Sequence, residues 1–89
     1  MIYSILLHPK SGKYLSELKG PLRTRIKAAL MELQHSPETK GDRLTPSAFW
    51  RIRVGDYQAI YEIDRKNETV VVLYIGHRSR VYDDFSRLL

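Results

Sequence analysis

The first half of the chain shows a pattern of apolar positions that predicts one strand and two helices. Ile2–Leu7 is apolar and branched, which is typical of a short, largely buried strand. Pro9 cannot continue a central strand but suits the first turn of a helix, so a helix is expected over Pro9–Lys19. Gly20-Pro21 interrupts that helix, and Pro21 begins a second one that ends at Ser36-Pro37. The second helix carries an apolar stripe made of Leu22, Ile26, Ala29, Leu30 and Leu33.

The second half of the chain changes to a period of two after a polar segment, Glu38–Ser47, which we interpret as a loop. Apolar and polar residues alternate over Phe49–Val54 and Tyr57–Asp64, with Gly55-Asp56 as the turn between them. A second turn precedes Thr69–Ile75, an almost unbroken apolar run that predicts a central strand buried on both faces. Ser79 is placed to cap a short final helix with an apolar stripe of Val81, Phe85, Leu88 and Leu89.

The order of these elements predicts an α+β fold. It runs strand, helix, helix, three-stranded antiparallel meander and short helix, with the helical hairpin packed on one face of the sheet. The chain has 89 residues, so we expect a single domain over 1–89. Its short apolar N-terminus is followed directly by His8, Pro9 and Lys10, which excludes a secretion signal or a membrane span there. We therefore expect a cytoplasmic protein with no membrane partner.

Charge and cysteine content narrow the possible functions. The 15 basic and 10 acidic side chains give a formal charge of +5, with the basic excess in the first half. Such a surface favours a polyanion or an acidic protein partner, although a solvated charged face is the plain alternative. The absence of cysteine excludes disulfides and thiolate metal sites. The three histidines, His8, His35 and His77, are scattered and lack carboxylate spacing, so we expect no metal and no small-molecule cofactor.

Two motifs make the chain resemble a known superfamily. Phe49-Trp50-Arg51-Ile52-Arg53-Val54-Gly55-Asp56-Tyr57 and its continuation to Ile63 resemble the signature hairpin of RelE/ParE toxins, and Gly76-His77-Arg78-Ser79-Arg80-Val81-Tyr82 resembles their C-terminal motif. The resemblance implies a toxin of a type II toxin–antitoxin pair, inhibited by a cognate antitoxin protein. In the RelE branch, which this chain resembles more, it implies an mRNA endonuclease acting on ribosomes that carry mRNA. In the ParE branch the same fold poisons DNA gyrase and cuts no RNA.

RNA can be cut without a metal when its 2′-hydroxyl attacks the adjacent phosphate. The step needs in-line geometry, proton transfer and stabilisation of charge on the phosphorane. Arg51 and Arg53 lie two residues apart, so they share the strand face opposite Trp50, Ile52 and Val54. A guanidinium grips two phosphate oxygens and stays protonated, so this pair is a candidate phosphate clamp. The alternative is an exposed sheet face bearing two charges.

The C-terminal motif supplies the remaining candidates. By the resemblance, Arg78 stabilises the phosphate and Tyr82 stacks on a base and orients or activates the 2′-hydroxyl, while Arg80 is a further substrate-binding candidate. A phenol with a pKa of about 10 is a poor base unless cations surround it, and Arg51, Arg53 and Arg78 are the available ones. Packing of the final helix is the alternative role for Tyr82.

Gln58 is where the chain departs from the superfamily pattern. Many RelE-type toxins carry Arg directly after the Tyr of the hairpin, as a phosphate ligand or proton donor. Gln58 donates a hydrogen bond but has no charge, so it remains a substrate-binding candidate. Losing one cation costs on the order of 10²–10³ in rate at such a site. The departure leaves a gyrase poison of the ParE type as the alternative function, and a plain basic nucleic-acid-binding module as the third.

Two aromatic side chains near the motifs have competing roles. His77 precedes Arg78, and strand parity points it to the opposite face, which favours a structural histidine over a general base. Trp50 can stack on a base, but core packing beneath the helices is the better interpretation.

Overall fold

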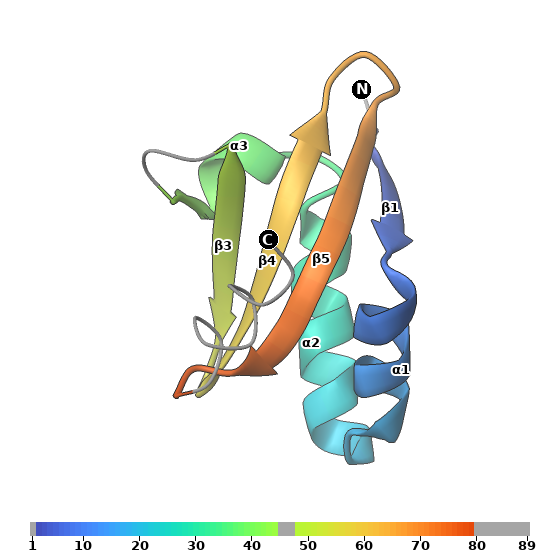
Figure 1. Cartoon of the computed structure of the whole chain (residues 1–89), viewed down its shortest axis with the longest axis vertical. Coiled ribbons are helices and arrows are strands. Elements are labelled where there is room, and N and C mark those ends of the chain that lie inside the picture. Colours follow the sequence, from blue (N-terminus) through green and yellow to red (C-terminus); the bar gives the residue numbers. More distant parts are fainter. Residues whose placement is uncertain (1, 45–47, 80–89) are drawn as a thin grey trace.

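The computed structural model of the chain describes residues 2–44 and 48–79 as one five-stranded sheet with helices against one face (Figure 1). The strand order is β1-β5-β4-β3-β2, with β1 parallel to β5 and every other pair antiparallel. This arrangement confirms the predicted α+β class. The elements are β1 (Ser4–Leu7), α1 (Pro9–Glu17), α2 (Gly20–Glu32), α3 (Pro37–Lys40), β2 (Asp42–Arg43), β3 (Phe49–Val54), β4 (Tyr57–Asp64) and β5 (Thr69–His77).

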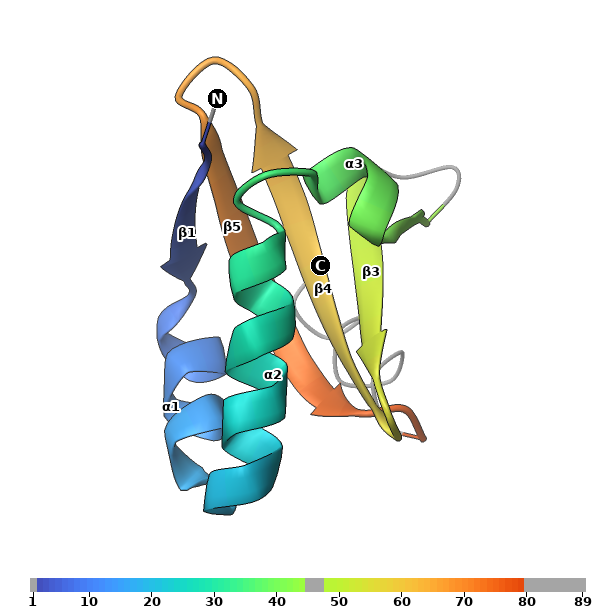
Figure 2. The ribbon, with the colours of Figure 1, turned by 180° about the vertical axis from the view of Figure 1, so that it is seen from behind.

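The helices α1 and α2 lie side by side over the sheet, as Figure 2 shows from behind. The predicted stripe of α2 is the buried one, since Ile26, Leu30 and Leu33 are almost fully enclosed. They pack against the sheet residues Ile52, Ala59, Tyr61, Val70, Val72 and Ile75. Each fully buried side chain of this size contributes about 1.5–3 kcal/mol, so this layer holds the helical hairpin on the sheet. His8 caps α1 by accepting a hydrogen bond from the Lys10 amide, which is a structural role.

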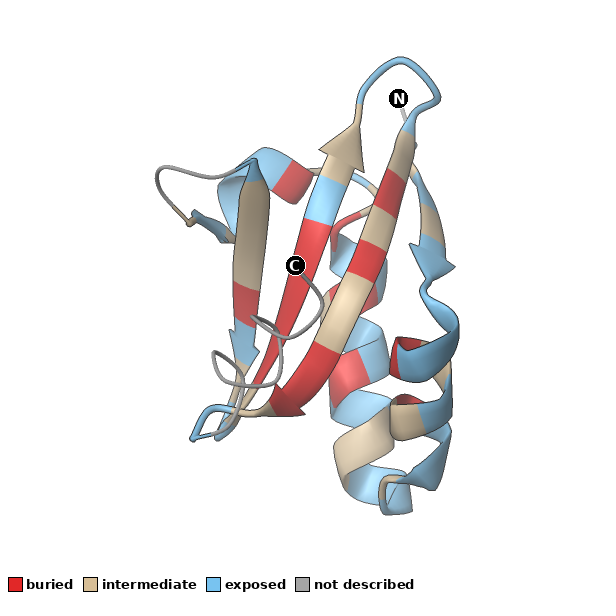
Figure 3. Cartoon of the chain, in the orientation of Figure 1, coloured by how far each residue is buried: buried red, intermediate tan, exposed pale blue. Residues whose placement is uncertain are grey.

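Burial on both faces of the sheet was predicted for β5, and the structure shows it for β4 as well. Residues 58–61 of β4 are all buried (Figure 3), although their sequence alternates like that of a half-exposed strand. The open face, which we define as the sheet face opposite α1 and α2, carries a second apolar cluster around the fully buried Ile60. A register shift between Ile60 and Tyr61 sends both Leu73 and Tyr74 to this cluster. That shift explains why the β5 sequence shows no alternation.

The predicted burial of the first strand is wrong. Most of β1 is exposed, including the side chains of Leu6 and Leu7, and Ile2 before it is exposed too. Because β1 is the edge strand beside β5, it has a neighbour on one side only. An apolar run therefore identified the strand but did not give its place in the sheet.

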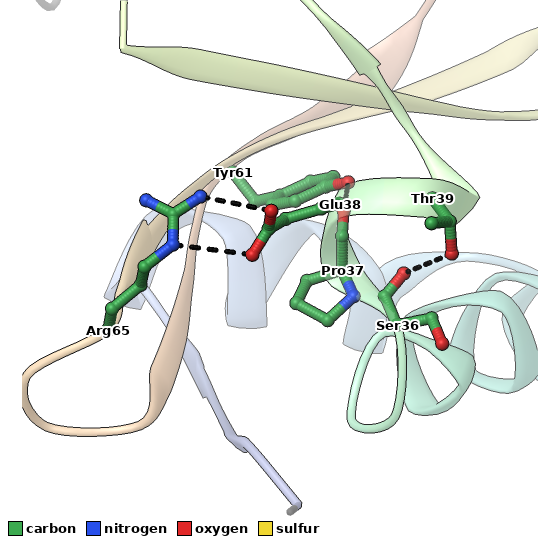
Figure 4. A network of polar contacts seen from close by, with 6 residues as sticks. All are labelled: Ser36, Pro37, Glu38, Thr39, Tyr61 and Arg65. Carbon is green, nitrogen blue, oxygen red and sulfur yellow. Dashed lines mark hydrogen bonds and ion pairs between the residues drawn. The ribbon is translucent and has the colours of Figure 1, made fainter.

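The predicted loop over Glu38–Ser47 is also wrong in part. The structure has the helical turn α3 and the two-residue strand β2 there, which adds a fifth strand beside β3. Tyr61 holds α3 in place, since its hydroxyl donates a 2.6 Å hydrogen bond to the Pro37 carbonyl (Figure 4). Gly41 packs directly on that hydroxyl, and a Cβ at this position would clash with it. Both contacts join residues far apart in sequence, so local pattern could not show them.

The last predicted element falls at the end of the chain. The predicted final helix lies outside the described residues, apart from its expected capping residue Ser79, and so do Arg80 and Tyr82. Within 2–44 and 48–79, the structure contains no helix that is long and apolar enough to span a membrane.

Candidate functional site

The open face carries most of the described candidate residues in two adjacent rows. Register places Arg53 of β3 beside Gln58 of β4, and Gln58 beside Gly76 of β5. The next row along the strands runs from Arg51 through Ile60 to Tyr74. Neighbouring strands are about 5 Å apart, so residues in a row are within reach of one ligand. Each row therefore joins residues that are up to 23 positions apart in the sequence.

The predicted arginine pair lies on the open face, as parity required. Arg53 is exposed, whereas the Arg51 side chain keeps only 17% of its surface accessible. The Arg51 Nη2 atom lies 3.8 Å from the Asp42 carboxylate, which β2 brings alongside β3. Trp50 faces the other way and stacks on Tyr61, with ring centroids 6.4 Å apart. Core packing is thus the role of Trp50, and the two arginines differ in how much each meets solvent.

Arg78 directly follows β5 and lies beside the β3–β4 turn. Its backbone N–H donates a 2.8 Å hydrogen bond to the Asp56 carbonyl in the β3–β4 turn, and its Nε lies 3.9 Å from Asp56 Oδ1. Gly55 begins this two-residue turn with φ +60°, a conformation that costs glycine little. The Arg78 side chain is 68% exposed. The turn therefore fixes the backbone of Arg78 two residues beyond the row that contains Arg53 and Gln58.

Gln58 occupies the centre of its row and is only 6% exposed. Within the described part of the chain, its buried Oε1 has no hydrogen-bond partner. Beside it, Gly76 leaves room for the Tyr74 ring, because a Cβ there would come within 2.6 Å of the ring. An unsatisfied buried carbonyl oxygen costs about 1–3 kcal/mol, which a protein does not ordinarily leave uncompensated. Among the described residues, the departure from the superfamily pattern is thus a buried acceptor without a partner.

His77 lies on the helix side of the sheet, as parity predicted. Its ring packs edge-on against Tyr57, with centroids 5.4 Å apart and planes at 81°. Its Nδ1 atom accepts the Ser79 amide at 3.2 Å and lies 2.8 Å from the Ser79 hydroxyl. Sequence reasoning missed Asp56 and Ser79 as neighbours of Arg78. The Gly-Asp turn was the available signal, but its proximity to the end of β5 is a tertiary fact.

Tyr61 anchors the element that supplies Asp42. Burial raises the pKa of Tyr61 to about 12, and the nearby Asp42 carboxylate adds to the effect. The phenol is therefore neutral at any ordinary pH and serves as a donor to α3. In chemical terms, the described part of the candidate site holds guanidinium groups, which can stabilise negative charge. The proposed proton-transfer residue, Tyr82, lies outside it, as does Arg80.

Comparison with known proteins identifies the class to which this fold and site belong. Residues 5–82 match the family described as "ParE toxin of type II toxin-antitoxin system, parDE". The chain belongs to this family of type II toxins, within the RelE/ParE superfamily that its motifs resemble. A search among curated proteins gave no match.

Solved structures of RelE toxins are similar to this chain over nearly its whole length. The RelB–RelE antitoxin–toxin complex from Methanococcus jannaschii has 30% identity and a TM-score of 0.69, covering 90% of this chain and 98% of that one. An E. coli RelE mutant in the free state has 25% identity and a TM-score of 0.77, with both chains covered completely. The archaeal RelE–RelB complex from Pyrococcus horikoshii OT3 has 24% identity and a TM-score of 0.78, covering 90% and 99%. The predicted resemblance to the RelE branch is confirmed.

Proposed function

We propose that this toxin is an endoribonuclease that cuts mRNA on translating ribosomes. The observation that carries the proposal is that Arg51 and Arg53 share the open face, while the backbone of Arg78 is bonded to the β3–β4 turn that follows Arg53. Three guanidinium groups around one phosphate supply the charge stabilisation that phosphoryl transfer needs most. A surface of this kind suits the phosphate backbone of single-stranded RNA, provided that a partner holds the RNA in the geometry for in-line attack.

The proposed reaction needs no metal. The RNA 2′-oxygen bonds to the adjacent phosphorus as the bond to the 5′-oxygen breaks. Tyr82 orients or activates the 2′-hydroxyl and, as the phenolate, accepts its proton. Water donates a proton to the leaving 5′-oxygen, and the hydroxide that remains takes the proton back from Tyr82. Arg51, Arg53 and Arg78 stabilise the phosphorane, while Gln58 and Arg80 contact the substrate. The products are a 2′,3′-cyclic phosphate and a 5′-hydroxyl end.

Two partners accompany this function. The ribosome aligns the mRNA, which compensates for a site without an evident strong base. A cognate antitoxin holds the toxin inactive, as the solved complexes of RelE with RelB suggest by similarity. An acidic segment of such an antitoxin matches the basic charge of the chain, formally +5.

A ParE-type gyrase poison is the second candidate function. The match to the ParE toxin family and the uncharged Gln58 favour it. Under this alternative the arginines contact a protein surface and no RNA is cut. When the toxin is produced without an antitoxin, the nuclease function predicts cut mRNA, whereas the gyrase function predicts a loss of DNA supercoiling.

The test is to express the toxin without an antitoxin and to map RNA ends and plasmid supercoiling in the same cells. We expect translation to stop and new 5′-hydroxyl ends to appear within translated mRNA. Purified toxin should cut mRNA on ribosomes and should cut naked RNA poorly. Loss of supercoiling with unchanged mRNA ends would establish the gyrase function instead.

An inactive control makes the test specific. Arg78→Ala should reduce cleavage by on the order of 10²–10³ without changing the thermal midpoint, because the side chain is exposed. An Arg78→Ala protein as active as the parent would remove this residue from the site. A 2′-deoxy nucleotide at the cut position should block cleavage by the parent toxin.

A further inference from the structure

Contacts before, at and after Arg78 fix the backbone of this segment, while the Arg78 side chain stays exposed. Before Arg78, the His77 ring packs against Tyr57. At Arg78 itself, the backbone N–H bonds to the Asp56 carbonyl at 2.8 Å. After it, the Ser79 amide donates to His77 Nδ1 at 3.2 Å. A side chain on a fixed backbone loses less entropy when it grips a ligand than one on a loose loop.

Asp56 also contacts the Arg78 guanidinium in an informative orientation. Its Oδ1 lies 3.9 Å from Nε, the atom nearest the chain. A carboxylate on that side leaves the two terminal nitrogens available as a fork for phosphate oxygens. The Asp42 carboxylate, by contrast, lies 3.8 Å from the terminal Nη2 atom of Arg51. Asp56 therefore lies on the Nε side of its arginine rather than at the fork.

The His77 ring contacts the backbone of Ser79 and does not lie on the open face. An amide nitrogen can only donate, so His77 Nδ1 is the acceptor for Ser79. Register with Tyr57 puts the ring on the helix side of the sheet, away from Gln58 and Arg53. The ring thus holds the peptide on either side of Arg78 in a tight turn.

We propose that Asp56 and His77 are positioning residues that seat Arg78 for phosphate binding. The proposal rests on the function proposed above, in which Arg78 contacts the substrate. Asp56 sets the direction of the guanidinium, and His77 fixes the backbone from which the side chain projects. Neither residue touches the reacting atoms.

Two substitutions of His77 separate positioning from catalysis. His77→Phe keeps a ring against Tyr57 but removes the acceptor for Ser79. His77→Asn restores an acceptor, because asparagine commonly bonds the amide two residues on. We expect His77→Phe to lower kcat on ribosomes by on the order of tenfold, and His77→Asn to recover most of it. Equal loss in both variants would make His77 catalytic and overturn the proposal.

Asp56→Asn tests the second positioning residue. We expect a two- to fivefold loss of cleavage, because an exposed pair of this kind is worth about 1 kcal/mol or less. In an Arg78→Lys background the same change should have no effect, since lysine has no Nε to aim. Glu17→Gln, which removes one exposed carboxylate from α1, is the matched control and should leave the rate unchanged. A faster Asp56→Asn enzyme would show that the carboxylate competes with substrate.

Amide hydrogen exchange on the free protein keeps this proposal separate from the proposed function. Ser79 should lose protection in His77→Phe and keep it in His77→Asn, whatever the toxin's target. If protection follows this pattern but the protein cuts no mRNA, the proposed nuclease function is wrong, while the role of His77 in fixing the backbone around Arg78 stands. Protection lost in His77→Phe with an unchanged cleavage rate would refute positioning.

Discussion

At the residue scale, Gln58 is where sequence and structure bear most directly on activity. It lies between Arg53 and Gly76, almost fully buried, with a carbonyl oxygen that makes no hydrogen bond to any described residue. A polar side chain held in that state costs stability, so its presence needs a reason. Placement beside the arginine pair points to the site rather than to the core.

Replacing Gln58 with arginine should test the missing charge. We expect Gln58→Arg to raise cleavage on ribosomes by about tenfold, because a cation is added beside Arg53 and Arg78. The thermal midpoint should fall by several degrees, because a charge is then partly buried among like charges. A folded Gln58→Arg protein that cuts no faster would contradict this explanation of the departure.

Gln58→Met provides the matched control for that change. Methionine has a similar size and no unsatisfied oxygen, so it should stabilise the fold by about 1 kcal/mol or leave it unchanged. Cleavage should not rise. An increase with methionine would mean that polarity at this position inhibits the proposed cleavage, whatever its charge.

At the element scale, the short pair α3 and β2 depends on β4 for its position. α3 has four residues and β2 has two, so neither is stable alone. Tyr61 holds the start of α3, and an ion pair between Arg65 and Glu38 at 3.2 Å supports it from the outside. Through β2, this contact keeps Asp42 beside Arg51.

Tyr61→Phe should show what the hydroxyl contributes. Loss of its hydrogen bond to Pro37 leaves a buried carbonyl unpaired, so the free energy of unfolding should fall by about 1–3 kcal/mol. The measurement is urea unfolding of both proteins at pH 7. An unchanged free energy of unfolding would mean that α3 is held without this bond.

The same pair of proteins should differ in alkaline solution. The folded-state pKa of Tyr61, about 12, lies above the unfolded value of 10. Its contribution to stability is therefore complete below pH 10 and disappears as pH rises through about 12. Stability of the parent should fall more steeply over pH 10–12 than that of Tyr61→Phe. The variant serves as the control because the other tyrosines titrate in both proteins.

At the scale of the whole molecule, the two ends of the sheet carry different charge arrangements. Arg53 and Arg78 lie toward the β3–β4 turn, whereas Arg65 lies at the β4–β5 turn, where Glu38 compensates it. Basic residues of α1 and α2 lie on the opposite side of the sheet from the open face. Binding of a polyphosphate chain should therefore depend on one end of one face.

Salt dependence measures this asymmetry. The logarithm of toxin affinity for ribosomes should fall linearly with the logarithm of salt concentration. Arg53→Gln should make that slope shallower by about one, because one phosphate contact is lost. Arg65→Gln removes the same charge at the far end and should leave the slope unchanged. Equal slopes in both variants would remove Arg53 from the phosphate contacts.

The sequence by itself determined what local periodicity and local sterics control. Helical spacing identified the buried stripe of α2, and alternation put Arg51 and Arg53 on the face opposite Trp50. The same parity placed His77 away from that face. These predictions hold because each depends on residues a few positions apart, whose geometry a regular helix or strand fixes.

Only the tertiary structure decided which elements lie side by side. The exposed edge position of β1, the two-sided burial of β4 and the attachment of β2 through Tyr61 all follow from strand order and packing. So does the contact of Asp56 with Arg78, which are 22 positions apart in the chain. Contacts of this kind depend on how the whole sheet is assembled, and no pattern within one segment encodes them.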